Sequence, residues 1–448
     1  MPYILNTPQD QQAMLQAIGM KSLDELFDHI PAQLRLNRAL NVPRALTELE
    51  LTGHMKQLGG KNVACDQRPC FLGAGSYDHF IPAVVDVISS RGEFYTSYTP
   101  YQAEASQGNL QAFFEYQTLI TQLTGMDVSN ASLYEGGTAT IEAVLMSMTS
   151  TKRLGRVVTL GSVHPEYRQV MATYLHNLGV ELVTIRTPDG ICPLDQLESA
   201  VNDQTACVMV QHPNFFGCLE DTQAIGEIAN KAGAMFAVSV DPISLGMLKR
   251  PGDYGADIVV GEGQSLGSPM AYGGPYLGIL ACRESLVRKM PGRLVGQTVD
   301  RRGNRCWALT LQTREQHIRR DKATSNICTN QGLYALRASV YLSLLGPQGL
   351  HEVAELCLRK SHYAQEVLTA AGLKPVFHQP IFKEFALRVP GGNVPQFLAR
   401  LGDAGYHAGV DLGRWYPELH DCFLLAVTEK RTRDEIDGLA QAVRQVLT

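Results

Sequence analysis

The chain has 448 residues, of which 45% are apolar and 19% charged, and its formal net charge is −5 at pH 7. This length exceeds what a single hydrophobic core organises, so the sequence predicts a globular protein of two or more domains. The small negative charge gives no electrostatic basis for binding nucleic acid or an anionic membrane surface. No apolar run is long enough to span a bilayer.

The N-terminal sequence "MPYILNTPQDQQ" lacks the basic segment and long apolar stretch of a signal peptide, so we expect a cytoplasmic protein. Ten cysteines are scattered along the chain without a CxxC pair. Their spacing is a poor match to zinc sites and is typical of unpaired cytosolic thiols, so no metal is expected.

Residues 1–65 predict an N-terminal helical arm. Thr7-Pro8 has the pattern of a helix cap followed by proline at the first helical position. Ser22 to Glu25 resembles a capping box with an apolar face behind it. Such an arm can wrap around a partner subunit or pack on the chain's own core, and the sequence does not choose between the two.

Residues 66–346 predict a large α/β domain, in which Asn109 is expected to cap a helix that ends at Gly125. Apolar runs then alternate with amphipathic stretches, a pattern that favours a mostly parallel sheet covered on both faces. Only a Gly-Gly-Pro turn separates the last two runs, which predicts one antiparallel strand. The expected strands are 156–160, 180–185, 206–210, 235–240, 256–260 and 276–281.

A long helix over 331–345 is stopped by Gly346-Pro347, and a second helix over 350–371 leads into the last part of the chain. Residues 347–448 are then expected to form a small α+β domain. Its predicted order is strand, helix, strand, helix, over 384–389, 394–405, 422–427 and 432–447.

Parts of a pyridoxal-phosphate (PLP) site can be sought at the carboxyl ends of the strands. The phosphate needs backbone N–H groups at a helix N-terminus, and Gly136, Gly137 and Thr138 precede a predicted helix. The pyridine nitrogen needs a carboxylate, and Asp241 ends a predicted strand. Taken alone, the first motif is more often a glycine turn capped by Thr138, and the second is more often a turn residue.

The third requirement, a lysine for the Schiff base, is not met. It is expected one strand further on, near residue 265, where the chain has serine. Lys249 comes too soon after Asp241, and Lys322 lies well beyond the sheet.

Two further segments are unusual. Tyr95, Tyr98 and Tyr101 recur at three-residue spacing in "EFYTSYTPYQAEASQGNL", which suits an interface or a ligand pocket as well as a core. The segment "RRDKATSNICT" is a basic loop before a helix, where Ser325 or Thr329 could act as a cap, and it also fits a solvated helix start.

Taken together, these segments resemble the P-protein of the glycine cleavage system, the PLP-dependent glycine dehydrogenase (decarboxylating). The motifs that carry the resemblance run in order from about residue 5 to the C-terminus. They are "FLGAGSYDHFIP", "YTSYTPYQAEASQGNLQAFFEYQTLITQLTGMDVSNASLYEGGTATIEA", "RRDKATSNICTNQ" and "TEKRTRDEID". The resemblance implies an aminotransferase-like large domain of fold type I.

The family occurs either as one long chain of two homologous halves or as two subunits, and this length suits the N-terminal half, the alpha subunit. The PLP lysine belongs to the other half, in a loop of the form "GAD…HK…P…GGP". Here "GADIVVGEGQSLGSPMAYGGP" keeps the flanking residues but has Gln264-Ser265 in place of His-Lys. The resemblance therefore implies that the beta subunit holds PLP covalently, and that Gly136–Thr138 and Asp241 are remnants of an ancestral site.

The resemblance also implies residues that reach the partner's active site. These are Tyr95, Tyr98, Tyr101 and Gln102, followed by Lys322, Ser325 and Asn326. The expected complex is α2β2, decarboxylates glycine on PLP and passes the aminomethyl group to the lipoyl group of the H-protein. Two other hypotheses are a self-sufficient PLP enzyme that uses Lys249 and an inert scaffold that stabilises its partner.

Overall fold

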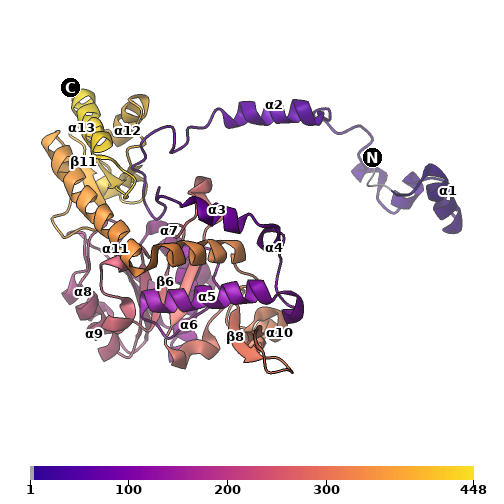
Figure 1. The fold of residues 1–448 in the computed structure, drawn as a ribbon, viewed down its shortest axis with the longest axis horizontal. Helices are drawn as coiled ribbons and strands as arrows, with labels where there is room; N and C mark the ends of the chain where they lie inside the picture. The colour runs from indigo at the N-terminus through magenta and orange to yellow at the C-terminus, as the bar shows by residue number, and fades with distance from the viewer. Residues whose placement is uncertain (1–4) are drawn as a thin grey trace. The chain divides into compact units, whose positions relative to one another are not determined.

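The computed structural model describes residues 5–448. The chain divides into two compact units, with the boundary between Val63 and Ala64 (Figure 1). The predicted division of the second unit at residues 346 and 347 stays a prediction. Within residues 5–448, no helix has both the length and the apolar character needed to cross a membrane.

The first unit consists of short helices without a core of their own. Thr7 caps α1 (Pro8–Ala17) as predicted, and Thr47 caps α2 (Glu48–Gly59). The predicted helix behind Ser22 is wrong, because only a 3₁₀ turn over Asp24–Phe27 forms there. Leu15 is the one buried hydrophobic residue among the described residues of this unit. The unit exposes many large apolar side chains, including Leu34, Leu36, Leu40, Leu49 and Met55.

A seven-stranded sheet organises the second unit, in the order β1-β7-β6-β5-β4-β2-β3. Strands β2 to β6 pair in parallel, and β7 runs antiparallel to both of its neighbours, which confirms the predicted antiparallel strand. The bounds are β1 (Val128–Ser129), β2 (Arg156–Leu160), β3 (Glu181–Ile185), β4 (Thr205–His212), β5 (Met235–Val240), β6 (Ile258–Glu262) and β7 (Gly278–Cys282).

Both faces of this sheet are buried, as the unbroken apolar runs predicted. Along β4, Val208 and Val210 belong to one hydrophobic cluster, while Cys207 and Met209 belong to the cluster on the opposite face. The helices of the second unit before the long C-terminal ones are α3 (Ala83–Ser89), α4 (Gly92–Tyr95), α5 (Gln107–Thr124), α6 (Gly136–Thr151), α7 (Pro165–Leu175), α8 (Leu194–Ala200), α9 (Thr222–Lys231) and α10 (Gln316–Arg319).

Helix α5 begins two residues before the predicted cap, so the assignment of Asn109 as its N-cap is wrong. The predicted end is confirmed, because Gly125 closes the helix in the left-handed conformation, with φ of 71°. A two-stranded sheet that the sequence did not predict, β8 (Leu294–Val299) with β9 (Arg305–Thr310), packs against α5.

Helix α11 (Gly332–Ala370) runs beside α5 and continues to the smaller sheet (Figure 1). It is interrupted at Gly346, where φ is 60°, as the Gly-Pro pair predicted. The smaller sheet has the order β10-β11-β13-β12 and its own hydrophobic cluster. Its elements are β10 (Lys374–Pro375), β11 (Glu384–Arg388), α12 (Val394–Asp403), β12 (Val410–Asp411), β13 (Cys422–Ala426) and α13 (Arg433–Leu447).

Candidate functional site

The carboxyl ends of the parallel strands bring the predicted coenzyme-site residues to one edge of the large sheet. Asp241 follows β5, Ser265 follows β6, and α6 begins at Gly136. We call the region around these residues the remnant pocket. Ser265 is buried, and its hydroxyl has no hydrogen-bond partner within residues 5–448. No amine of this chain therefore stands at the position of the expected Schiff-base lysine.

The backbone N–H groups at the start of α6 are occupied by two carboxyl side chains of the chain itself. Glu135, the N-cap of α6, accepts from Gly137 N at 2.5 Å and from Thr138 N at 2.9 Å. Glu262 accepts from Gly136 N at 2.8 Å, and also from Gln264 N and Leu277 N. The N–H groups that were predicted to hold an anion therefore already donate to carboxyl oxygens of the chain.

Burial raises the pKa of Glu262 to about 8, against the opposing effect of its backbone hydrogen bonds. Burial likewise raises the pKa of Glu135. The Tyr167 ring stacks on His164 with centroids 4.5 Å apart. Its hydroxyl lies so close to Gly136 that a β-carbon there would collide with it. An aromatic side chain therefore also lies across the start of α6.

Asp241 has a partner that the sequence analysis did not identify. Its Oδ2 lies 2.8 Å from Nζ of Lys383, a lysine whose side chain is only 2% exposed. The same ammonium group lies 3.0 Å from Nε2 of His79 and 3.5 Å from the centroid of the Tyr77 ring. His79 Nδ1 lies 2.6 Å from Oε2 of Glu429. The four groups form a chain of alternating donors and acceptors from Asp241 to Glu429.

The remnant pocket does not fit PLP, because the places of its phosphate and ring nitrogen are filled. Lys249, the alternative lysine, is exposed and lines a surface hollow with Gln223 and Glu227 of α9. The only signal for Lys383 in the sequence was a charged pair, Lys383-Glu384, at the start of an apolar strand. That pattern predicts only a strand beginning at Glu384.

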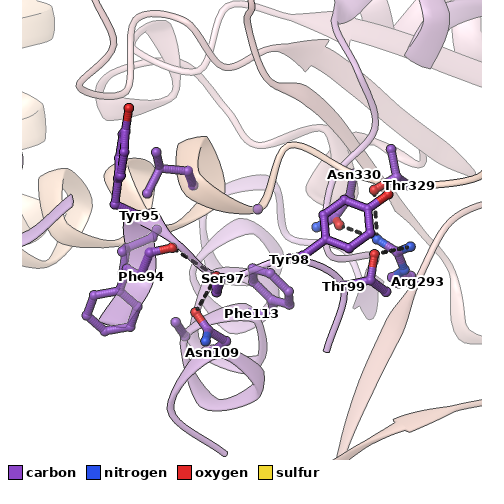
Figure 2. Close-up of a pocket in the computed structure, with 14 residues that line it drawn as sticks. Phe94, Tyr95, Ser97, Tyr98, Thr99, Asn109, Phe113, Arg293, Thr329 and Asn330 are labelled. Atoms are coloured by element: carbon purple, nitrogen blue, oxygen red, sulfur yellow. Dashed lines mark hydrogen bonds between the residues drawn. The ribbon is translucent and has the colours of Figure 1, made fainter. Parts of the chain in front are cut away.

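Two of the predicted partner-facing residues, Tyr95 and Tyr98, lie at a second site, which has an open pocket. A cavity of about 240 Å³ is lined by Tyr95 and Tyr98 together with Phe113, Arg293 and Asn330 (Figure 2). We call it the tyrosine pocket. Tyr95 is 69% exposed and Tyr98 87% exposed, values far above those of core aromatic residues. The core interpretation of these tyrosines is therefore disfavoured.

Arg293 joins the two segments that the sequence singled out separately. Its guanidinium group donates to Thr99 Oγ1 at 3.2 Å, Thr329 Oγ1 at 3.0 Å and Asn330 Oδ1 at 2.8 Å (Figure 2). It also lies 5.6 Å from the Tyr101 ring centroid. Arg293 is 2% exposed, so this arginine is a buried bridge. No motif marked it in the sequence.

Four other predicted residues do not line the tyrosine pocket. Gln102, Lys322 and Asn326 are exposed, and none of them lines the tyrosine pocket. Ser325 is half-buried and accepts from Ile327 N at 3.0 Å, so its hydroxyl orders the loop and does not cap α11. The α11 N-cap is Gln331, which excludes Thr329 from that role as well.

The loop before α6 connects the two sites. Tyr134 Oη accepts from Cys328 N at 3.0 Å, and Asn330 Nδ2 donates to Ala131 O at 2.6 Å. The segment over residues 328–331 is thereby fixed to the segment over 131–134, immediately before the occupied cradle. The loop over residues 131–134 thus links residues of the tyrosine pocket to the start of α6.

The chain matches the family model described as "Glycine cleavage system P-protein" over residues 1–443. It belongs to that family. Curated relatives match this chain over nearly their whole length. A probable glycine dehydrogenase (decarboxylating) subunit 1 of Desulforamulus reducens is 53% identical over 98% of both chains. A protein of the same name from Moorella thermoacetica is 51% identical over 100% of both.

Solved structures agree with the P-protein assignment. A crystal structure of glycine decarboxylase (P-protein) of the glycine cleavage system, in inhibitor-bound form, is 43% identical, with a TM-score of 0.91 and full coverage of both chains. An alanine–glyoxylate aminotransferase from Nostoc sp. is 17% identical with a TM-score of 0.60, covering 86% of this chain and 96% of its own. This more distant likeness confirms the predicted aminotransferase-like fold.

Proposed function

We propose that the chain is the alpha subunit, the one without the coenzyme lysine, of a two-subunit glycine decarboxylase. The observation that carries the proposal is the contrast at the sheet edge: Ser265 stands where a lysine is required, while Asp241 is already paired with Lys383. A chain of this family built in this way needs an amine from another polypeptide. The curated relatives named as subunit 1 support a second subunit.

In this proposal the partner, the beta subunit, holds PLP covalently in an α2β2 complex located in the cytoplasm. When bound there, PLP supplies an electron sink that makes loss of CO2 from glycine possible. The complex then passes the aminomethyl group to the lipoyl group of the H-protein. This chain contributes residues beside the partner's site and holds no coenzyme itself.

The tyrosine pocket is the part of this chain that we assign to the partner's active site. Tyr95, Tyr98 and Tyr101 offer apolar ring surface and hydroxyl groups, a combination that suits a pocket completed by a second chain. Once covered by the partner, Tyr98 would exclude water and hold the glycine carboxylate in the orientation that decarboxylation requires. Gln102, Lys322, Ser325 and Asn326 are proposed to line the rim of the same contact.

We further propose that the N-terminal arm packs on the partner. Its helices have almost no buried apolar residue of their own, and exposed side chains such as Leu36 and Leu49 would be covered by an interface. A chain that lacks residues 1–63 is expected to bind the partner more weakly than the full chain in analytical ultracentrifugation. Equal affinity of the two forms would assign the arm to another role.

The test of the proposed function is co-expression of this chain with a homologous lysine-bearing chain. Glycine-dependent release of CO2, with lipoylated H-protein present, is measured for each chain alone and for the pair. We expect turnover from the pair only, and none when the partner's coenzyme lysine is replaced by alanine. Turnover by this chain alone would contradict the proposal and favour a self-sufficient enzyme.

The scaffold hypothesis is tested in the same assay. It predicts that a variant of Tyr98 that still assembles with the partner leaves turnover unchanged. The exposure of Tyr98 and Tyr95 at an open pocket disfavours the scaffold hypothesis, because a scaffold contact needs no hydroxyl-lined cavity.

A further inference from the structure

We infer that the remnant pocket is filled by an internal replacement for the coenzyme, assembled from the chain's own side chains. Lys383 takes the place of the protonated ring nitrogen opposite Asp241, and Glu135 with Glu262 takes the place of the phosphate at the α6 N-terminus. The chain therefore folds and closes this pocket without any coenzyme and binds none there, even without a covalent link. This inference goes beyond the missing lysine, because non-covalent binding needs no lysine.

The first support is that side chains of the chain pair the polar groups at both ends of the pocket, by charge at Asp241 and by hydrogen bonds at the start of α6. At one end, a buried ammonium group lies 2.8 Å from the Asp241 carboxylate, the partner that a pyridinium nitrogen would otherwise need. At the other end, carboxyl oxygens accept from the N–H groups of Gly136, Gly137 and Thr138. These are the groups that would hold a phosphate at a helix N-terminus.

The second support is that an aromatic ring also occupies the space beside the cradle. The Tyr167 ring stacks on His164, which is fixed in turn because its Nε2 donates to Ala74 O at 2.8 Å. Burial lowers the pKa of His164, which agrees with a neutral ring that donates through Nε2. A coenzyme entering the pocket would have to displace a stacked tyrosine as well as both carboxyl groups.

The third support is that the replacement ties separate parts of the second unit together. Tyr77 Oη donates to Glu384 Oε2 at 2.6 Å, and Asp78 forms ion pairs with Lys430 at 2.7 Å and Arg431 at 3.0 Å. Segments far apart in the sequence thus meet at Lys383. Removing this side chain would leave buried charges unpaired, so the cluster is integral to the fold.

A metal ion is a poorer explanation of the same cluster. His79, Cys357 and Glu429 have ligand atoms within 4.8 Å of one another. Both nitrogens of His79 already face polar partners, and the one that points away from Glu429 faces the Lys383 ammonium. A cation in contact with this imidazole would lie next to another cation, whereas a charged lysine satisfies the same groups without one.

The binding test uses the full chain alone and pyridoxamine 5′-phosphate, which lacks the aldehyde and cannot label surface lysines. A coenzyme site typically has a Kd of about 1 μM. We expect calorimetry to show no saturable binding of pyridoxamine 5′-phosphate at concentrations up to about 100 μM. The lysine-bearing partner chain serves as the positive control. One-site binding to this chain in the micromolar range would overturn the inference.

The second test opens the cradle. In the Glu135→Ala variant the N–H groups of Gly137 and Thr138 lose their acceptor, so inorganic phosphate should raise the melting temperature by about 1–3 °C over chloride of equal ionic strength. The unmodified chain should show no such phosphate effect. Thr432→Ala, which removes the N-cap of α13 next to Asp434 and Glu435, is the matched control. A phosphate effect equal in all three proteins, or absent from Glu135→Ala, would contradict the inference.

The third test supplies the missing amine. The Ser265→Lys variant, treated with PLP and borohydride, should carry no pyridoxyl group on residue 265 when its peptides are analysed by mass spectrometry, because the rest of the pocket stays filled. Labelling of residue 265 would overturn the inference. The inference rests on the proposed function only in assigning glycine turnover to the partner chain. Inactivity of the co-expressed pair would defeat that function, while binding to the isolated chain would still decide this one.

Discussion

The remnant pocket and the tyrosine pocket are linked through residues 131–134, yet the polar groups of the first are paired within the chain and the tyrosines of the second are exposed. In the remnant pocket the donors of α6 and the carboxylate of Asp241 are paired within the chain. In the tyrosine pocket, Tyr95 and Tyr98 present their rings to solvent. Internal pairing produces a closed structural element, whereas exposed aromatic rings on a fixed backbone produce a surface ready for a partner.

The largest effect on stability is expected from breaking the ion pair between Lys383 and Asp241 in the remnant pocket. Lys383→Met leaves the Asp241 carboxylate buried without its partner, which should lower the free energy of unfolding by about 3–5 kcal/mol. Asp241→Asn combined with Lys383→Met removes both charges and should recover most of that loss. Urea unfolding of the chain alone measures both variants. If the double variant is no more stable than the single one, the ion pair is not what holds the pocket closed.

The next effect concerns the bridge below the open side. Arg293→Met removes the hydrogen bonds that join Thr99 to residues 328–330, so the tyrosines lose their fixed positions. We expect glycine–CO2 exchange by the reconstituted complex to fall by about 100-fold, as catalytic groups displaced by about 1 Å do.

Hydrogen exchange gives the second readout for Arg293→Met. Amides over residues 94–102 should exchange faster than in the unmodified chain, while the strands of the large sheet keep their protection. Faster exchange throughout the chain would instead show that Arg293 serves general stability.

A smaller effect is expected from a single hydroxyl group in the open pocket. Tyr98→Phe keeps the ring and removes one hydrogen-bonding group, which should reduce exchange by about 2- to 12-fold. Tyr174→Phe on α7, a partly exposed tyrosine that does not line the tyrosine pocket, is the matched control. Equal rates for both variants and the unmodified complex would return the tyrosine pocket to a purely structural role.

The smallest effect is a change in pH dependence on the closed side. Burial raises the pKa of Glu262 from 4.5 to about 8, so the folded chain binds this proton more tightly than the unfolded chain. Its contribution to stability is complete below about pH 4.5 and is lost as the pH rises through 8. Between pH 7 and 8, Glu262→Gln should therefore lose less stability than the unmodified chain, by about 1 kcal/mol. Parallel stability curves would show that Glu262 stays ionised when folded.

The fold was largely predictable because its strands are continuous apolar runs between glycines and helices. β2, β5 and the antiparallel β7 lie within about two residues of their predicted positions. The strands that were missed are short or half-exposed: β1 has two residues, and β8 ends in exposed positions. Such strands carry little periodic signal, because their pairing depends on neighbours far away in the sequence.

The two pockets were predictable to different degrees. The missing lysine at Ser265 and the dense tyrosines near Tyr98 could be read directly from the residues. The roles of Lys383 and Arg293 could not, because each is a single charged side chain whose partners come from distant segments. Glu135 and Glu262 belonged to segments that were singled out, but their hydrogen bonds to α6 became visible only in the structure.

The crowding at the start of α6 also limits what a single substitution at position 265 can achieve. A lysine introduced at position 265 would still face N–H groups that are occupied by Glu135 and Glu262, and the Tyr167 hydroxyl beside them. Asp241 would still be paired with Lys383. Several substitutions would have to occur together, and each one alone would leave a buried charge or donor unmatched. Under the proposed function, a substitution at position 265 alone would therefore not give this chain a coenzyme site of its own.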